Sequence, residues 1–452
     1  MQIKRNYNEP FFRERLVRRR QRRSYLLRNL LIFLVLLAGA ALFILTQPGL
    51  VTRTAYAVLG IAATPTPLPS ALAMQAQALY FAGDLDEAAE LLAQAIAQQP
   101  DTIDYLYEYG MLLIDENESE PVGALAERIS DIDASDVRGF ALRARALVWE
   151  GQPAAAIPVA RAGLQLDPNF APLHEALSWA YTATGDWRQG IDYGRLAVEL
   201  APGDVRAYWA YANALTTVGA YQESIDVLQQ AIDVHPAFLP PYFQLALLYV
   251  SADRDQEAIS TYDYILSLEP RNAQAQLRLC QVYRKVGEYQ QALGECQDAV
   301  EIDPGYVAAR LQLGLLRYNN REFRSALEQF SACAELAPDN LACNYRMGLS
   351  YYYVAREAAQ ICAGTPDDPL CETDIHLQGC QIAWDTLQDA LIQAQAQADT
   401  ERDVDIIREG LDAITRDPLC AGSSNRLPFT QPTPAPTEPP APTPTVDPAG
   451  AA

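Results

Sequence analysis

Apolar and small residues repeat along most of this chain with a period of 34 positions. Glycines recur in this frame at Gly83, Gly151, Gly185, Gly219 and Gly287, and small residues follow five places later at Ala88, Ala156, Gly190, Ser224, Ala258, Ala292 and Ala326. Prolines close successive periods at Pro100, Pro168, Pro202, Pro236, Pro270, Pro304 and Pro338, while Ala134 takes the place of one missing proline. A period kept over so many units indicates an internal structural repeat.

Each period predicts a helical hairpin. An apolar helix of about 14 residues leads to a turn at the glycine, a second helix carries the small residue, and the proline ends it. Large apolar residues are expected to fill the contact rows of the hairpins: Tyr80, Leu147, Tyr181, Leu215, Tyr249 and Tyr283 in or next to one row, and Tyr221, Tyr289 and Phe323 in another. One hairpin cannot bury its apolar face alone, so neighbours must stack into an all-α solenoid.

Two units depart from the pattern. Residues 103–136 lack both the turn glycine and the closing proline, and carry an acidic loop at 115–120. The last unit begins at Leu341 and takes an insertion near residues 363–377. The pattern therefore predicts about nine repeats over residues 69–396, followed by a capping helix within residues 397–420 that covers the open apolar end.

The repeat resembles the tetratricopeptide repeat family, most clearly in Gly287-Glu288-Tyr289-Gln290-Gln291-Ala292 followed by Ala299 and Asp303-Pro304. The resemblance covers roughly residues 69–396. It implies a right-handed superhelix in which the first helices of successive hairpins line a concave peptide-binding groove. It also implies a non-catalytic scaffold or assembly factor that binds other proteins.

The first helices of units three to nine hold ten basic residues and only two acidic ones, Glu150 and Glu175, whereas the second helices are rich in acids. A basic and aromatic inner face is therefore expected, suited to an extended segment with acidic and aromatic or apolar side chains. The candidate groove residues are Arg145, Trp149, Trp179, Arg206, Trp209, Asn213, Phe243, Arg278, Arg284, Tyr318 and Tyr345. The alternative is that several of these aromatics belong to the hairpin core, one register away. Lys4 and Lys285 are the only lysines, which does not favour the family's carboxylate clamp.

The N-terminal part predicts a membrane anchor. Residues 1–29 form a basic tail, and residues 30–46 are an uncharged apolar run. Such a run can span a bilayer core of about 30 Å, and arginines on its N-terminal side place that end in the cytoplasm. The repeats are then extracytoplasmic, on a single-pass signal-anchor helix in the cell membrane. A cleaved signal peptide, cut at Ala38-Gly39-Ala40 or Ala55-Tyr56-Ala57, is the alternative, and it would also export the repeats.

Proline and threonine dominate two further segments. Residues 47–68 are expected to form a stiff linker, and residues 427–452 a disordered, extended tail. The tail and the preference for arginine over lysine are typical of a bacterial protein.

Eight cysteines lie in the C-terminal half: Cys280, Cys296, Cys333, Cys343, Cys362, Cys371, Cys380 and Cys420. An even number in an exported chain indicates disulfides. Cys280 and Cys296 fall on the two helices of one hairpin, Cys333 and Cys343 flank an inter-repeat turn, and the last four would tie the insertion and the cap. Alternatively, Cys280, Cys296 and Cys333 only replace alanine as small buried residues.

Charge and motifs narrow the function. Subtracting the ten basic and two acidic residues of positions 1–28 from the chain totals of 34 and 57 leaves 24 and 55, a net charge near −31 that disfavours nucleic acid. Hydrolase, nucleotide-binding and zinc-site motifs are absent from the sequence, so no catalytic, cofactor or metal site is expected. Two alternatives to a scaffold remain: a structural tether or spacer at the cell envelope, and a regulatory subunit of an enzyme whose active site lies on another chain.

Overall fold

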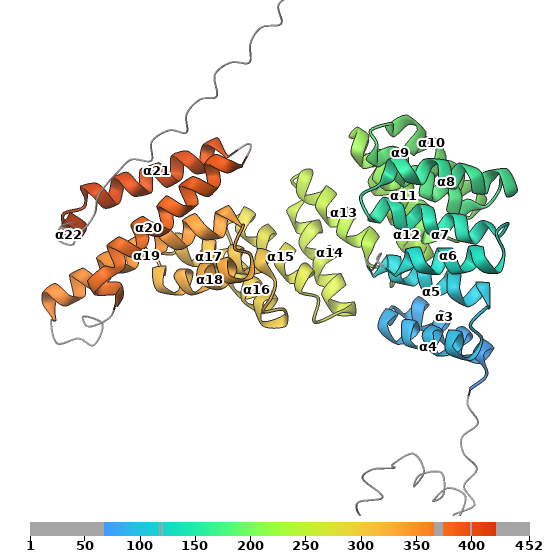
Figure 1. The fold of residues 1–452 in the computed structure, drawn as a ribbon, viewed down its shortest axis with the longest axis horizontal. Coiled ribbons are helices and arrows are strands. Elements are labelled where there is room, and N and C mark those ends of the chain that lie inside the picture. Colours follow the sequence, from blue (N-terminus) through green and yellow to red (C-terminus); the bar gives the residue numbers. More distant parts are fainter. Residues whose placement is uncertain (1–66, 117, 119–120, 366–373, 398–399, 422–452) are drawn as a thin grey trace, which may run out of the picture.

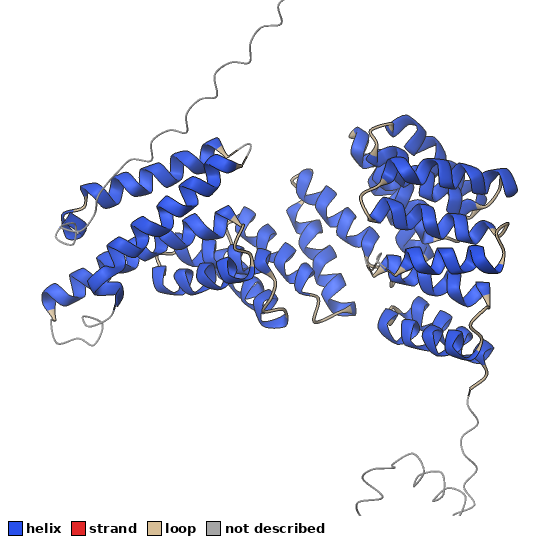
Figure 2. Ribbon diagram, in the orientation of Figure 1, coloured by secondary structure: helices blue, strands red, loops and turns tan. Residues whose placement is uncertain are grey.

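The computed structural model describes residues 67–116, 118, 121–365, 374–397 and 400–421. Every regular element in these ranges is a helix (Figure 2). The helices from α3 to α20 pair as nine antiparallel hairpins, which confirms the all-α solenoid and the number of repeats.

The first hairpins are α3 (Pro69–Ala82) with α4 (Leu85–Gln98), α5 (Ile103–Asp115) with α6 (Val122–Ile132), α7 (Val137–Trp149) with α8 (Pro153–Leu166), and α9 (Ala171–Ala183) with α10 (Trp187–Leu200). The middle hairpins are α11 (Val205–Val218) with α12 (Tyr221–Val234), α13 (Pro240–Ser251) with α14 (Asp255–Leu268), and α15 (Ala273–Val286) with α16 (Tyr289–Ile302). The last are α17 (Val307–Asn319) with α18 (Phe323–Leu336), and α19 (Leu341–Gly364) with α20 (Asp374–Ala396). They are followed by α21 (Glu401–Arg416) and α22 (Pro418–Ala421).

A left-handed residue makes the turn inside most hairpins. Gly219 and Gly287 both have φ of 85°, a conformation that glycine adopts without steric cost. In the repeats that follow these two glycines, the same turn position is held by Asp253 and Arg321. Their φ angles are 56° and 64°. The turn geometry is thus kept even in the units without glycine, at some cost in backbone strain.

The small residues of the second helices lie at the contact between the paired helices. Ala88, Ala156 and Ala292 are completely buried, and a Cβ atom on Gly190 would collide with Thr182. In the fifth hairpin the Ser224 hydroxyl donates a hydrogen bond of 2.9 Å to the carbonyl of Ala212. These positions set the close approach of the helices, as the pattern predicted.

The hairpins from α3 to α12 curl tightly, and those from α13 onward extend away from them (Figure 1). The curl brings the end of α3 back to the loop after α12. The ring of His235 lies 4.9 Å from that of Tyr80 and stacks at 5.0 Å on that of Phe81, and Gly83 faces Ala237. We call this contact between the first hairpin and residues 235–238 the seam.

The last hairpin differs from the prediction in the extent of its insertion. Helix α19 continues to Gly364 and α20 begins at Asp374, so part of the predicted insertion at 363–377 is helical. Helix α21 covers the apolar end of the array, burying Ile407, Leu411 and Ile414. The helix lies within the residues predicted to form the cap.

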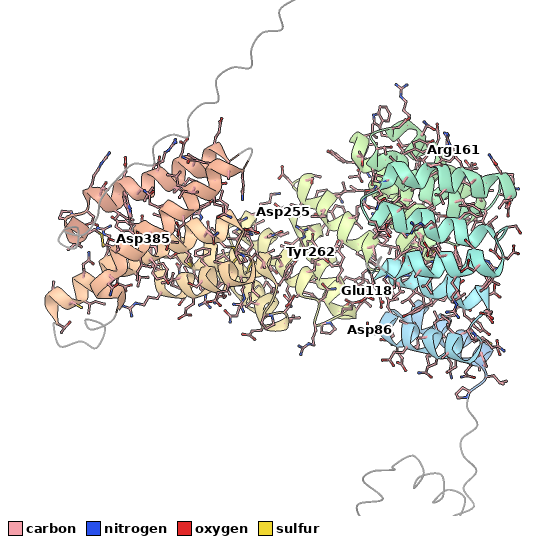
Figure 3. All side chains as sticks on the ribbon, viewed as in Figure 1. Asp86, Glu118, Arg161, Asp255, Tyr262 and Asp385 are labelled. Atoms are coloured by element: carbon pink, nitrogen blue, oxygen red, sulfur yellow. A yellow bond between two sulfur atoms is a disulfide. The ribbon has the colours of Figure 1, made fainter. Side chains whose placement is uncertain are left out.

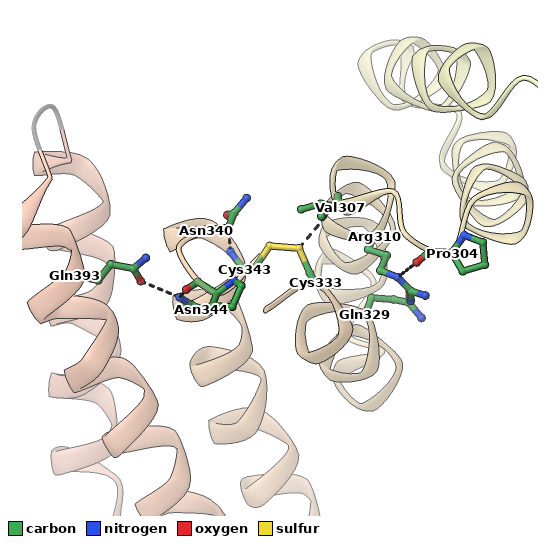
Figure 4. Close-up of a disulfide and its surroundings, with 10 residues drawn as sticks. Pro304, Val307, Arg310, Gln329, Cys333, Asn340, Cys343, Asn344 and Gln393 are labelled. Carbon is green, nitrogen blue, oxygen red and sulfur yellow. Dashed lines mark hydrogen bonds between the residues drawn. A yellow bond between two sulfur atoms is a disulfide. The ribbon is translucent and has the colours of Figure 1, made fainter. Parts of the chain in front are cut away.

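Three disulfides join pairs of cysteines that both lie in the described part of the C-terminal half. Cys280–Cys296 joins α15 to α16, Cys333–Cys343 joins α18 to α19 (Figure 4), and Cys380–Cys420 joins α20 to α22. Cys362 is also disulfide-bonded, whereas Cys371 lies outside the described residues. The first two pairs are those that the helix positions predicted, so Cys280, Cys296 and Cys333 are more than replacements for alanine.

The predicted basic tail, membrane helix, most of the linker and the C-terminal tail lie outside the described residues. No helix in the described part of the chain is both long enough and apolar enough to cross a membrane.

Candidate binding groove

A groove of about 1040 Å³ lies inside the curl of the array. The α3–α4 turn and the α5–α6 loop form one wall. Helix α13 and the α14–α15 loop form the other, and α7, α9 and α11 supply the floor. This volume lies at the upper limit of the range of about 300–1,000 Å³ that is usual for small-molecule pockets.

Three tryptophans form the floor. The ring centroid of Trp179 lies 5.1 Å from that of Trp149 and 4.9 Å from that of Trp209, and all three pairs meet edge to face. Edge-to-face packing is a favourable geometry for aromatic rings. Their faces and edges therefore make a rigid aromatic surface, and Asn213 and Phe243 extend it along α11 and α13.

The inner arginines are neutralised within the protein. Arg145 is fully buried in an ion pair with Glu175, and its guanidinium lies 4.7 Å from the ring centroid of Trp149. Arg206 binds the buried carboxylate of Asp115 through two nitrogens, with Nε at 2.9 Å from Oδ2. The prediction that these two arginines meet a ligand in the groove is therefore wrong, because internal carboxylates occupy them.

The charge of the groove is also opposite to the prediction. No arginine or lysine is among the described residues that line it, whereas seven carboxylates are: Asp84, Asp86, Glu87, Asp115, Glu116, Glu118 and Glu269. Asp86 lies in the first turn of α4 and Glu118 in the α5–α6 loop, and both line the groove (Figure 3). The expected basic inner face is thus wrong for this groove, because its carboxylates come mainly from the start of α4, the end of α5 and the loops, which the count over the first helices of units three to nine does not include.

One carboxyl group of the acidic wall, that of Glu116, has a raised pKa. Burial, followed by the carboxylates of Asp86, Glu118 and Asp115, raises the pKa of Glu116 to about 7. The shift therefore reflects burial first and the neighbouring carboxylates second.

Polar groups without partners face the same space. The indole nitrogen of Trp179 and both ring nitrogens of His235 are buried and have no hydrogen-bond partner among the described residues. His235 is only 2% exposed, and burial lowers its pKa. Buried polar atoms are nearly always satisfied in proteins, so these atoms are exceptions in the described structure.

The other predicted groove residues lie elsewhere. Arg278 donates a hydrogen bond of 3.2 Å to Gln281, and Arg284 is exposed at the end of α15. Tyr345 is buried in the core beneath α21, as the register alternative allowed. Tyr318 lines a separate shallow cleft with Phe323 and Tyr353. The structure thus brings Trp149, Trp179, Trp209, Asn213 and Phe243 together and separates the remaining candidates from them.

A family model described as "Tetratricopeptide repeat" matches residues 73–120 and 243–307. No curated protein matches the sequence.

Several solved structures are similar to this chain. MamA from Desulfovibrio magneticus RS-1 is 18% identical, with a TM-score of 0.34, over 38% of this chain and 96% of MamA. PilF from Pseudomonas aeruginosa is 17% identical, with a TM-score of 0.40, over 47% of this chain and 96% of PilF. A structure of the APC/C hetero-tetramer Cut9-Hcn1 is 14% identical, with a TM-score of 0.49, over 72% of this chain and 58% of the matched one.

Proposed function

Since this chain contains tetratricopeptide repeats, we propose that it is a non-catalytic interaction scaffold or assembly factor that holds an extended segment of a partner protein in the groove. The observation that carries the proposal is the tryptophan floor of a groove of about 1040 Å³. Tryptophan is prominent among residues that dominate binding energy at protein interfaces.

The polar groups of the groove support an extended polypeptide as its ligand. The amide of Asn213 lines the groove and can pair with a backbone amide group of a bound segment. A polypeptide presents such groups at every residue, whereas its side chains can pack on the aromatic floor.

We further propose that the repeats stand outside the cytoplasm, held at the cell membrane by residues 30–46. The three described disulfides support this placement, because disulfides persist in oxidising compartments. A fusion of alkaline phosphatase to the C-terminus tests it in bacterial cells. The fusion should be active only if the repeats are exported, and an inactive fusion to a stably produced protein would reject the placement.

A photo-crosslinking amino acid at position 213 tests the groove in living cells, with the same amino acid at the exposed position 328 on α18 as control. A partner should be crosslinked from position 213 alone, and Trp179→Ala with Trp209→Ala should abolish it. If the double variant crosslinks the partner with the same yield, the groove does not bind the partner, and the tether or spacer is favoured. Circular dichroism of the double variant checks that the array still folds.

A further inference from the structure

We infer that the segment bound in the groove is basic, with arginine or lysine side chains between aromatic or apolar ones. This inference rests on the proposed function, and it reverses the acidic ligand that the sequence alone favoured. The chain bears a net charge of −23, but the argument depends on where the carboxylates of the groove lie rather than on that total.

Negative charge stands on both walls. Asp84, Asp86, Glu87, Glu116 and Glu118 lie on the wall made by the first two hairpins, and Glu269 lies on the opposite wall. Asp115 is neutralised by Arg206, but none of the other six forms an ion pair with an arginine or lysine in the described part of the chain. A cationic side chain placed between the walls would therefore meet unpaired carboxylates from two directions.

The floor favours the same ligand. A cation over the face of a tryptophan is attracted by the ring, and Arg145 already uses Trp149 in this way from below. The remaining rings of Trp179, Trp209 and Phe243 can pack against the aliphatic part of an arginine or lysine as well as against apolar side chains. An acidic segment would meet repulsion from the walls and gain nothing from the floor.

His235 lines the groove at the seam and is almost entirely buried. The site thus combines negative walls and an aromatic floor.

The occupant to which the inference commits is a segment of a partner protein. Charge complementarity supports it, because long-range attraction between opposite charges selects partners and speeds their association. The chain's own basic positions 1–28 are the competing occupant, and the experiment below separates the two.

Three pools of fluorescent decapeptides serve as probes, with Leu, Phe and Tyr randomised at five positions and Arg, Gln or Glu fixed at the other five. Binding to the purified full chain in detergent is measured by fluorescence anisotropy. The arginine pool should bind at least tenfold more tightly than the glutamine pool, and the glutamate pool more weakly still. The preference should shrink as salt rises, because ions screen charges in solvent.

A fourfold variant tests the wall; it carries Asp86→Asn, Glu87→Gln, Glu116→Gln and Glu118→Gln. This variant should bind the arginine pool at least tenfold more weakly than the unaltered chain. The control carries an equal charge change on exposed residues of α16 and α18, namely Asp298→Asn, Glu301→Gln, Glu328→Gln and Glu335→Gln, and should bind as the unaltered chain does. Glu116→Lys with Glu118→Lys should shift the preference toward the glutamate pool, which keeps the test decisive if the fourfold variant folds poorly.

The possible failures are distinct. Binding of the glutamine or glutamate pool in preference to arginine, if abolished by Trp179→Ala with Trp209→Ala, overturns the basic ligand and leaves the proposed function standing. If the arginine pool binds equally to the fourfold variant and its control, the basic ligand is overturned. If no pool binds, both the inference and the proposed function are rejected. A tenfold gain when Arg13, Arg15, Arg18, Arg19, Arg20, Arg22 and Arg23 become glutamine identifies the chain's own tail as the occupant and overturns the partner segment.

Discussion

Arg145 and Glu175 form a completely buried ion pair between α7 and α9, 30 positions apart in the chain. The repeat is 34 residues long, so the two partners are one helical turn short of equivalent positions. The same step of 30 separates Trp149 from Trp179 and Trp179 from Trp209, whose rings are in contact. The interior of the curl is thus organised by contacts between residues i and i+30.

Breaking this ion pair should destabilise the array strongly. Glu175→Ala leaves the guanidinium of Arg145 buried and uncompensated, at a cost of about 3–5 kcal/mol. Amide hydrogen exchange should show loss of protection in α7 and α9 before α17 and α18.

Arg145→Met with Glu175→Leu is the matched control, because replacing both charges by apolar groups of similar size is often neutral. The double variant should recover most of the protection. Equal loss in both variants would mean that packing, rather than the buried charge, determines stability there.

Ionisation of Glu116 should loosen the first two hairpins as the pH rises. Burial raises the pKa of this carboxyl from 4.5 to about 7, so the folded state binds the proton more tightly than the unfolded state. The stabilisation is therefore present below about pH 4.5 and is lost as the pH rises through 7. Solvent screening limits it to about 1 kcal/mol or less.

Glu116→Gln should remove this dependence, so that hydrogen exchange in α5 differs less between pH 5 and pH 8 than in the unaltered chain. Glu328→Gln, on the exposed face of α18, is the control. An undiminished pH effect in Glu116→Gln would assign it to another group.

The turns without glycine offer sites for stabilisation. Arg321 has φ of 64° and Asp253 has φ of 56°, and a side chain in this region costs about 1 kcal/mol. Arg321→Gly should therefore raise the free energy of local unfolding of α17 and α18 by about 0.5–1 kcal/mol, because part of the gain is lost to the flexibility of glycine in the unfolded chain. Gly287→Ala, which puts a side chain at φ of 85°, should have the opposite effect in α15 and α16. Thermal melts and hydrogen exchange of the two variants should change in opposite directions.

Loss of the Cys380–Cys420 disulfide should release the cap. This bond closes a loop with a sequence separation of 40, for which restriction of the unfolded chain amounts to about 4 kcal/mol. Cys380→Ser with Cys420→Ser should make α21 and α22 susceptible to limited proteolysis. The Cys333–Cys343 disulfide closes a loop with a sequence separation of only 10. Its removal by Cys333→Ser with Cys343→Ser should therefore increase proteolysis less. Similar proteolysis of both variants would indicate that loop length does not determine how much each disulfide stabilises the chain.

The period of the sequence was sufficient to predict the hairpins because prolines and small residues report directly on helix ends and helix contacts. It also identified the floor of the groove, since large aromatics on first helices such as Trp179 and Trp209 are costly unless they are packed. Two contact-row residues were misplaced: Tyr221 and Tyr289 are 51% and 59% exposed. They begin their helices, where the next hairpin does not cover them.

The sign of the groove's charge could not be obtained from the first helices alone. Asp86 lies in the first turn of α4 and Glu118 in the α5–α6 loop, and they share a groove with Glu269 only because the array curls. The only sequence signal was the acidic loop at 115–120 in the unit without a turn glycine, which resembled a solvated surface. A repeat of 34 residues also gives no indication that side chains 30 apart will meet, because that offset arises from the superhelix.

The seam joins the first hairpin to His235, which lies 155 positions after Tyr80 in the chain. The ring of His235 meets that of Tyr80 edge to face and stacks on that of Phe81. The two walls of the groove belong to the segments that this contact holds together. A mechanical pull between the first hairpin and α13 would therefore act on the seam before it acts on any helix. Under tension the walls would separate and release their ligand while the hairpins stayed folded.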